Sequence, residues 1–169
     1  MLVVALQMRS LVLTFILLPL WAFSQPAETI TGKVVGVHDG DTLTLLHGKG
    51  KKLKVRLEGI DAPETNQPYG DASRQALDDL VYGRVVTIVP VTVDKYGRTV
   101  AQVWLGKVAV NVEMVRQGLA WRYDHYSQDP VLGQAQQQAR AQRWGLWHDA
   151  HPTPPWVWRE MHPLPWPPH

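Results

Sequence analysis

A run of alternating residues constrains the fold of this chain more than any other feature. Residues 28–57 alternate polar side chains with β-branched or leucine side chains in the segments ETITGKVVGVH, DTLTLLH and KKLKVRLEG. A period of two is typical of strands with one buried face. Asp39-Gly40 and the sequence GKGK separate the segments, and both are typical of turns. The sequence therefore predicts three antiparallel strands that follow one another as a meander.

The segments that follow switch from a helical to a strand pattern. YGDASRQALDDLVYG predicts a helix that stops at Gly83. One face of that helix carries its apolar side chains, which are Ala72, Ala76, Leu77, Leu80 and Val81. Residues 84–94 and 98–106 return to strand composition and are joined by DKYG. Two further strands are therefore expected, which makes five.

The rest of the domain is predicted to be helical. Residues 108–120 place Val110, Met114 and Val115 on one face, and a second helix opens with Pro130 behind Asp129. This order of elements is that of a five-stranded Greek-key barrel of the OB type with about three helices packed on it. The expected class is mainly β with α-helices (α+β). Such barrels bind oligonucleotides, but a fold alone does not establish function.

The N-terminal 24 residues differ from the remainder. They hold one charged residue, Arg9, an apolar run, and a small-x-small pattern at residues 22–24, with Met1 or Met8 as the initiator. These features predict a cleaved secretory signal peptide, because the apolar run is shorter than the roughly 20 residues of a membrane-spanning helix. We therefore expect a protein exported to the periplasm or the medium.

The barrel domain is expected to span residues 25–148, followed by a tail over residues 149–169. The tail is rich in proline and tryptophan, so no regular element is predicted from His148 onward and the last half-dozen residues are expected to be disordered. Trp156 and Trp158 are expected to pack on the domain; the alternative is a proline-rich ligand for a partner.

The amino-acid composition limits the kinds of metal site and covalent cross-link that the chain can form. The chain has no cysteine, which excludes disulfides and zinc-thiolate centres, and its net charge of +2 says little about partners. With 45% hydrophobic and 19% charged residues it resembles an ordinary globular domain.

Four acidic residues follow two predicted strand ends. Asp39 and Asp41 flank the first turn, and Asp61 and Glu64 lie in EGIDAPET. Each alone is best explained as a solvated loop acid. A barrel can bring the two strand ends together, however, and acids at one rim repel one another unless a cation neutralises them. Oxygen-only ligands favour calcium, with magnesium or manganese as alternatives.

Two arginines lie on or beside the predicted strands. Arg56 and Arg98 would each usually extend to solvent, but beside an acid cluster their planar forks match phosphate oxygens. Lys54 lies on the same strand face as Arg56. Together with a metal, these groups form the parts of a metal-assisted phosphodiesterase.

Four motifs carry a family resemblance. VVGVHDGDTLTL, KVRLEGIDAPET, DKYGRTVAQVWL and VNVEMVRQGLAW resemble, in order and spacing, those of the staphylococcal-nuclease-like (thermonuclease) family over about residues 30–148. The resemblance implies a calcium-dependent endonuclease that cuts DNA and RNA to 3′-phosphate ends. It also implies that Asp41, Asp61 and the backbone carbonyl of Ala62 bind one Ca²⁺ ion.

The same resemblance assigns roles to the catalytic groups. It implies that Glu64 positions or deprotonates the attacking water, and that Arg56 and Arg98 bind phosphate and stabilise the transition state. Asp39 and Thr42 are expected to support the metal ligands. Tyr126, Lys54 and Tyr96 are the candidate contacts to nucleic acid.

Two alternatives stay open at this point. Trp121 and Tyr123 either stack on bases or close the core between barrel and helices. We expect a monomer that prefers single-stranded DNA or RNA. The alternative function is a noncatalytic OB module that binds nucleic acid or a protein, which would have no need of the complete set of acids and arginines.

Overall fold

A computed structural model describes residues 28–163. The predicted signal peptide, residues 1–24, and the last six residues lie outside the described part of the chain. Within residues 28–163 no helix is long and apolar enough to cross a membrane.

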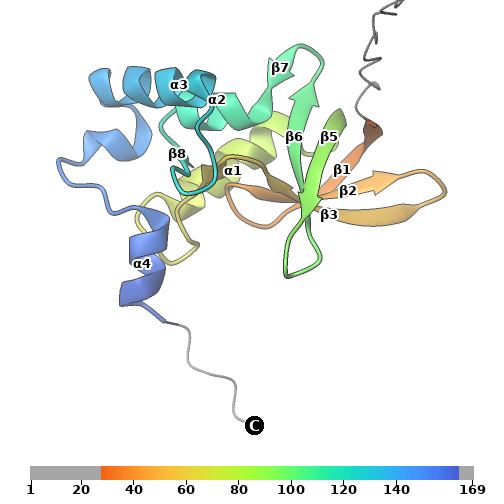
Figure 1. Ribbon diagram of the computed structural model, residues 1–169, viewed down its shortest axis with the longest axis horizontal. Coiled ribbons are helices and arrows are strands. Elements are labelled where there is room, and N and C mark those ends of the chain that lie inside the picture. The colour runs from red at the N-terminus through yellow and green to blue at the C-terminus, as the bar shows by residue number, and fades with distance from the viewer. Residues whose placement is uncertain (1–27, 164–169) are drawn as a thin grey trace, which may run out of the picture.

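A closed five-stranded barrel forms the centre of the molecule, as predicted (Figure 1). Its strands are β1 (Ile30–Val37), β2 (Thr42–His47), β3 (Lys51–Leu57), β5 (Val85–Val93) and β6 (Thr99–Leu105). The first three form the antiparallel meander, and β5 pairs with both β1 and β6. Parallel pairing of β6 with β3 closes the barrel, and the short β7 (Val108–Ala109) continues the sheet beyond β6.

The barrel core consists of the inward-facing residues of the alternating strands. Side chains with no exposed surface come from every barrel strand: Val34, Leu43, Leu45, Val55, Ile88, Ala101 and Val103. Removing one such leucine side chain typically costs about 2–5 kcal/mol, so this alternation fixes which face of each strand points inward.

Helices cover one end of the barrel. They are α1 (Gly70–Val81), α2 (Val110–Arg116) and α3 (Pro130–Ala141), followed by the 3₁₀ turn η1 (Gly145–His148). Val110, Met114 and Val115 are fully buried, as their spacing predicts. Asp129 caps α3 by accepting a hydrogen bond from the backbone N–H of Val131 at 2.8 Å. A two-stranded ribbon of β4 (Ile60–Asp61) and β8 (Trp121–Arg122) connects the barrel to the helices.

The prediction is wrong for one residue on the apolar face of α1. Ala72 is exposed, whereas its neighbour Ser73 is fully buried and donates a hydrogen bond to the carbonyl of Leu119. The buried face runs through Gly70, Ser73, Leu77 and Val81. A buried hydroxyl with a backbone partner is compatible with a core position, and hydropathy alone does not detect it.

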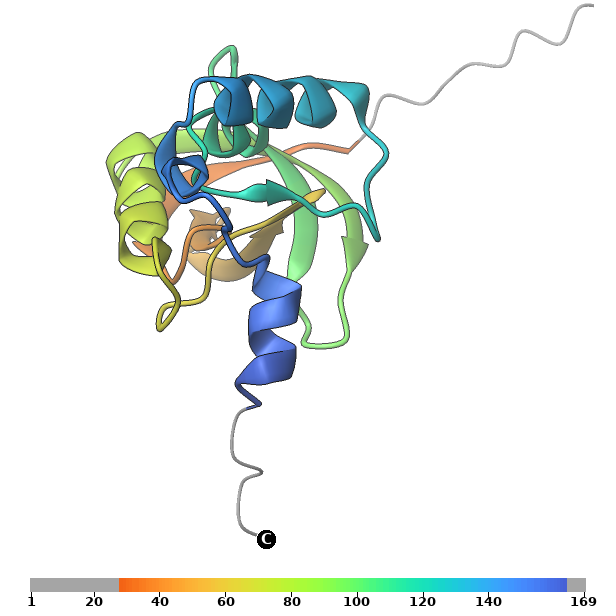
Figure 2. The same cartoon turned by 90° about the vertical axis from the view of Figure 1, so that its left-hand side faces the viewer.

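The prediction that no regular element follows His148 is also wrong. Residues Pro155–Met161 form a helix, α4, which extends from the body of the molecule (Figure 2). Pro155 occupies the first helical turn, where its missing N–H needs no partner. The following residues up to Met161 contain no proline. The prolines of this segment therefore set the start of a helix rather than preventing it.

Candidate active site

Asp41 lies at the end of the β1–β2 connection, immediately before β2. Its carboxylate is 5% exposed and accepts hydrogen bonds from the Ala62 backbone N–H at 2.7 Å and from the Thr42 hydroxyl at 3.0 Å. The carboxylate of Asp39 accepts a hydrogen bond from the Asp41 backbone N–H at 3.0 Å and so stabilises the turn. Asp39 and Thr42 therefore hold Asp41 from either side in the chain.

Gly40 is required for a close approach rather than for an unusual backbone angle. A Cβ at this position would lie 1.8 Å from the Ser73 hydroxyl oxygen and 2.8 Å from the Cβ of Ala62. The turn therefore packs directly against α1 and against the segment after β4, and only glycine leaves room for both contacts. This packing brings Asp41 next to the second acidic motif.

Asp61 reaches the same place from the β4–β8 ribbon. It pairs with Trp121 in that ribbon, and Asp61 is only 2% exposed. Ala62, which follows it, is buried as well. The structure thus brings the two acidic motifs together, as their positions after strand ends suggested.

Arg56 bridges the two carboxylates from the end of β3. Its guanidinium lies 3.1 Å from an oxygen of Asp41 and 2.9 Å from an oxygen of Asp61, and it also donates to the carbonyls of Leu57 and Ile60. The arginine side chain is 13% exposed. Three hydrogen-bond acceptors and the ion pair with Asp41 therefore fix the orientation of this guanidinium at the barrel rim.

Burial dominates the electrostatics of the two acids. Desolvation raises the pKa of Asp41 to about 6, although the charge of Arg56 opposes the shift. Desolvation also raises the pKa of Asp61, and the neighbouring Asp41 carboxylate adds to the effect. A cation bound beside the two carboxylates would favour their charged forms and so offset part of the cost of burying them.

The donor set fits a hard divalent ion. Asp41 and Asp61 offer carboxylate oxygens, Ala62 offers a backbone carbonyl, and no thiolate is present in the chain. Within residues 28–163 no group of three or more histidine, cysteine or acidic side chains is arranged to hold a metal. An ion bound here would therefore complete its shell with water or phosphate oxygens, which calcium and magnesium accept.

Glu64 lies at the mouth of the site on the loop that leads to α1. Its side chain is 38% exposed, and its backbone N–H donates to the Gln67 side chain at 3.0 Å. Gly70 packs against the Glu64 carbonyl so closely that a Cβ would lie 2.0 Å from it. The loop is therefore held against the start of α1, while the Glu64 carboxylate stays accessible to solvent.

Arg98 lies at the end of the β5–β6 connection. It pairs with Asp94 at 2.7 Å, and in the described part of the chain no hydrogen bond joins it to Asp41, Asp61 or Glu64. Its neighbour Thr99 pairs with Val55, the residue before Arg56, so Arg98 sits at the strand end that flanks the cluster. The predicted role of Arg98 in phosphate binding stays a prediction.

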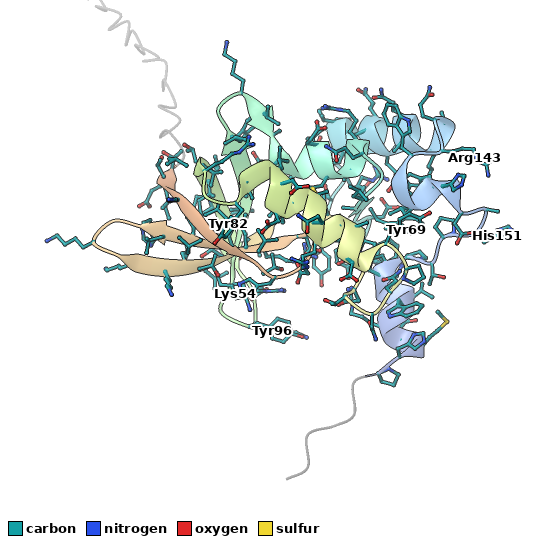
Figure 3. All side chains as sticks on the ribbon, turned by 180° about the vertical axis from the view of Figure 1, so that it is seen from behind. Lys54, Tyr69, Tyr82, Tyr96, Arg143 and His151 are labelled. Atoms are coloured by element: carbon teal, nitrogen blue, oxygen red, sulfur yellow. The ribbon has the colours of Figure 1, made fainter. Side chains whose placement is uncertain are left out.

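The candidate contacts to nucleic acid are exposed. Lys54 and Tyr96 extend from the same side of the barrel in Figure 3, from β3 and from the β5–β6 connection. Tyr96 is 71% exposed, and the Arg98 guanidinium lies 5.3 Å from its ring centroid. These side chains give the strand end beside Arg56 a basic and aromatic surface.

The aromatic residues of the LAWRYDHY segment differ in burial, and only some of them lie at the surface. Trp121 is buried against Trp147, with ring centroids 4.3 Å apart, so it closes the core rather than stacking on bases. Tyr123 is half-buried and stacks on Trp156 at 5.3 Å. Tyr126 is 78% exposed and is available to a ligand.

Sequence reasoning missed one residue of the site, Arg159 on α4. Its guanidinium lies 2.8 Å from an Asp61 oxygen and 2.7 Å from a Glu64 oxygen. One signal pointed to it: the segment between Pro155 and His162 is a proline-free window in which Trp156 and Trp158 can anchor a helix.

A barrel whose rim joins paired buried carboxylates to guanidinium groups is an arrangement suited to phosphodiester hydrolysis. Comparison with known proteins agrees with this class. The family model described as "Staphylococcal nuclease homologue" matches residues 54–149. The chain belongs to this family of staphylococcal nuclease homologues.

Individual relatives match over most of the chain. An "Uncharacterized endonuclease" of Haemophilus influenzae is 45% identical over 154 residues, covering 90% of this chain and 86% of the relative. A "Micrococcal nuclease" of Shigella flexneri is 36% identical over 159 residues, covering 88% and 87%. "Protein ParB" of Escherichia coli is 40% identical over 152 residues, covering 83% and 82%.

Proposed function

We propose that the protein is a calcium-dependent endonuclease that hydrolyses phosphodiester bonds of DNA and RNA and leaves 3′-phosphate ends. The observation that carries this proposal is the buried Asp41–Arg56–Asp61 cluster, in which one guanidinium lies within 3.1 Å of both carboxylates. A binding module would not need two buried acids with raised pKa values, because burying them costs stability. The names of the endonuclease and micrococcal nuclease relatives support the same reaction class.

The proposed metal site uses Asp41, Asp61 and the carbonyl of Ala62. A bound calcium ion would polarise the phosphodiester group and neutralise charge that develops on its oxygens. Asp41 is kept in place by Ala62 and Thr42, so its carboxylate is preorganised for this role. Because a carboxylate must be deprotonated to bind a metal ion, the raised pKa values of both acids imply that calcium binding weakens as the pH falls towards the range in which they are protonated.

The remaining groups of the site would act on the water and on the phosphate. Glu64, accessible at the mouth of the site, would orient or deprotonate the attacking water. Arg56 and Arg98 would donate hydrogen bonds to phosphate oxygens and stabilise the pentacoordinate transition state. The water oxygen forms a bond to phosphorus while the bond to the 5′ oxygen breaks, and the 5′ oxygen gains a proton. The products are a 3′-phosphate and a 5′-hydroxyl end.

The exposed aromatic and basic residues suggest a preference for single strands. Tyr126 and Tyr96 present accessible rings on which unpaired bases can stack, and Lys54 adds positive charge beside Arg56. Bases in a duplex are already stacked and offer their faces less readily. We further propose that the protein acts as an exported monomer, in keeping with the signal-peptide pattern of residues 1–24.

The test is incubation of the protein with single-stranded DNA, with calcium or with a chelator. Cleavage should require calcium and should produce fragments whose 3′ ends are labelled only after phosphatase treatment. Asp61→Asn should abolish cleavage while the protein stays folded. Chelator-resistant cleavage, or binding without cleavage in calcium, would contradict the proposal, and the second result would favour the noncatalytic binding module.

A further inference from the structure

Arg159 occupies the acidic side of the candidate active site. Its two terminal nitrogens lie 2.8 Å and 3.3 Å from the two oxygens of Asp61, and one of them also lies 2.7 Å from Glu64. The Arg56 guanidinium donates a further hydrogen bond, of 2.9 Å, to one of these oxygens of Asp61. Both oxygens of Asp61 therefore accept hydrogen bonds from guanidinium groups.

The helix that carries Arg159 is held in place by contacts other than these ion pairs. The Trp158 indole donates to the Asn66 side chain at 3.2 Å, and the Gln67 side chain donates to the Thr153 carbonyl at 2.7 Å. Trp156 stacks on Tyr123 with an interplanar angle of 18°. The tail is therefore anchored on the loop after β4 and on the segment after β8, and this anchoring places α4 within reach of Asp61 and Glu64.

The arginine itself is less constrained than its helix. Its side chain is 42% exposed, and Arg159 lies two positions before the last residue of α4. A long side chain at such a position can rotate into solvent while the backbone of the helix stays where it is. The contact with Asp61 and Glu64 is thus a reversible one.

From this arrangement we infer that Arg159 is a tethered competitor of the metal ion, here called the Arg159 latch. The inference rests on the proposed calcium site. A guanidinium and a calcium ion both need the lone pairs of Asp61, so binding of one weakens binding of the other. The latch neutralises Asp61 and Glu64 while the ion is absent, and calcium must displace it before Glu64 is free to act on water. The tail thereby sets the calcium concentration at which the enzyme becomes active.

The test measures calcium binding directly by calorimetry, without nucleic acid, in the wild-type chain and in Arg159→Gln. The variant should bind calcium on the order of tenfold more tightly, because a bidentate charge-assisted contact no longer has to be broken. Arg116→Gln is the matched control, since Arg116 is also an exposed helical arginine paired with a glutamate, Glu113. Its affinity for calcium should equal that of the wild type.

Equal or weaker calcium binding by folded Arg159→Gln would overturn the latch and leave the calcium site intact. Absence of calcium binding in all three proteins would overturn the proposed calcium site and the latch together. A second measurement needs no variant: the assigned Nε–H NMR signal of Arg159 in the wild-type chain should shift as calcium is added. A signal that stays unchanged at saturating calcium would also overturn the latch.

Discussion

Arg56 and Asp61 form a buried ion pair in which the guanidinium lies 2.9 Å from the carboxylate. The pair joins the end of β3 to β4, and neither side chain is more than 13% exposed. The same arginine is therefore a structural counter-ion when the site is empty of substrate and a candidate phosphate ligand when substrate binds.

Removing Arg56 should affect both stability and rate. Arg56→Ala leaves the buried Asp41 carboxylate without its counter-ion and leaves Asp61 paired with Arg159 alone. Breaking a buried pair in this way typically costs about 3–5 kcal/mol of unfolding free energy. The rate of single-stranded DNA hydrolysis should fall by about 10³–10⁵, on the scale of transition-state arginines in phosphoryl transfer. Denaturant unfolding and initial-rate assays on the same preparation measure the two effects.

Arg56→Lys distinguishes the role of Arg56 as a structural counter-ion from its role in catalysis. It keeps the positive charge, so much of the stability should return, but an ammonium lacks the planar fork of donors that matches two oxygens of one phosphate. Hydrolysis should therefore remain slow. Near-normal hydrolysis by either folded variant would contradict the catalytic role.

Removing Arg98 should affect the rate alone. Arg98 pairs with Asp94 at a partly exposed turn, and such pairs contribute about 0–1 kcal/mol. Arg98→Ala should therefore unfold near the wild-type midpoint but hydrolyse DNA about 10³–10⁵ more slowly. Arg84→Ala removes an exposed arginine immediately before β5; it is the control and should retain full activity.

The Asp94–Arg98 pair also predicts a pH dependence of stability. Burial opposes the effect, but hydrogen bonds from Arg98 and Tyr96 lower the pKa of Asp94 below its usual value of 3.8. A lowered pKa in the folded state contributes stability above pH 3.8, and this contribution is lost as the pH falls through the folded value. Asp94→Asn should therefore be less stable than wild type by about 0.2–1 kcal/mol at pH 7. In acid-unfolding experiments the difference between the two proteins should shrink as the pH falls below 3.8 and should vanish below the folded pKa of Asp94. A difference that acid leaves unchanged would contradict the assignment.

Substitutions of Glu64 and Asp61 should distinguish the catalytic step from metal binding. Glu64→Gln removes the candidate base but no predicted metal ligand, so calcium affinity should persist while the rate falls by about 10²–10⁴. Asp61→Asn should lose calcium binding as well as activity. Calorimetry with calcium and single-turnover assays distinguish the two variants; loss of calcium binding in Glu64→Gln would place Glu64 among the ligands.

Tyr126 should contribute to substrate binding without contributing to stability. Its ring is 78% exposed, so Tyr126→Ala should leave the unfolding midpoint unchanged. Loss of one stacked base costs about 1–3 kcal/mol, which corresponds to an increase of about 5- to 150-fold in KM for single-stranded DNA. Tyr82→Ala, at an exposed tyrosine beyond α1, is the control and should not change KM.

Local patterns predicted most of the fold. The alternation of residues 28–57 specified the meander, because a shift by one residue would turn every apolar side chain outward. Asp129 and Pro130 marked the start of α3, because capping chemistry depends on neighbouring residues alone. Ala72 was misplaced because Ser73 is buried through a hydrogen bond to Leu119, a partner 46 residues away.

The sequence alone specifies the residues of the barrel strands, the acids and arginines that follow their ends, and the family of the chain. Those properties depend on short-range periodicity and on motifs that are contiguous in the chain. The sequence alone does not reveal that Arg56 bridges Asp41 and Asp61, or that Arg159 enters the site from α4, because both contacts depend on three-dimensional packing. Arg159 meets Asp61 across 98 residues, and such a contact depends on how Trp156 and Trp158 anchor the tail rather than on any local pattern.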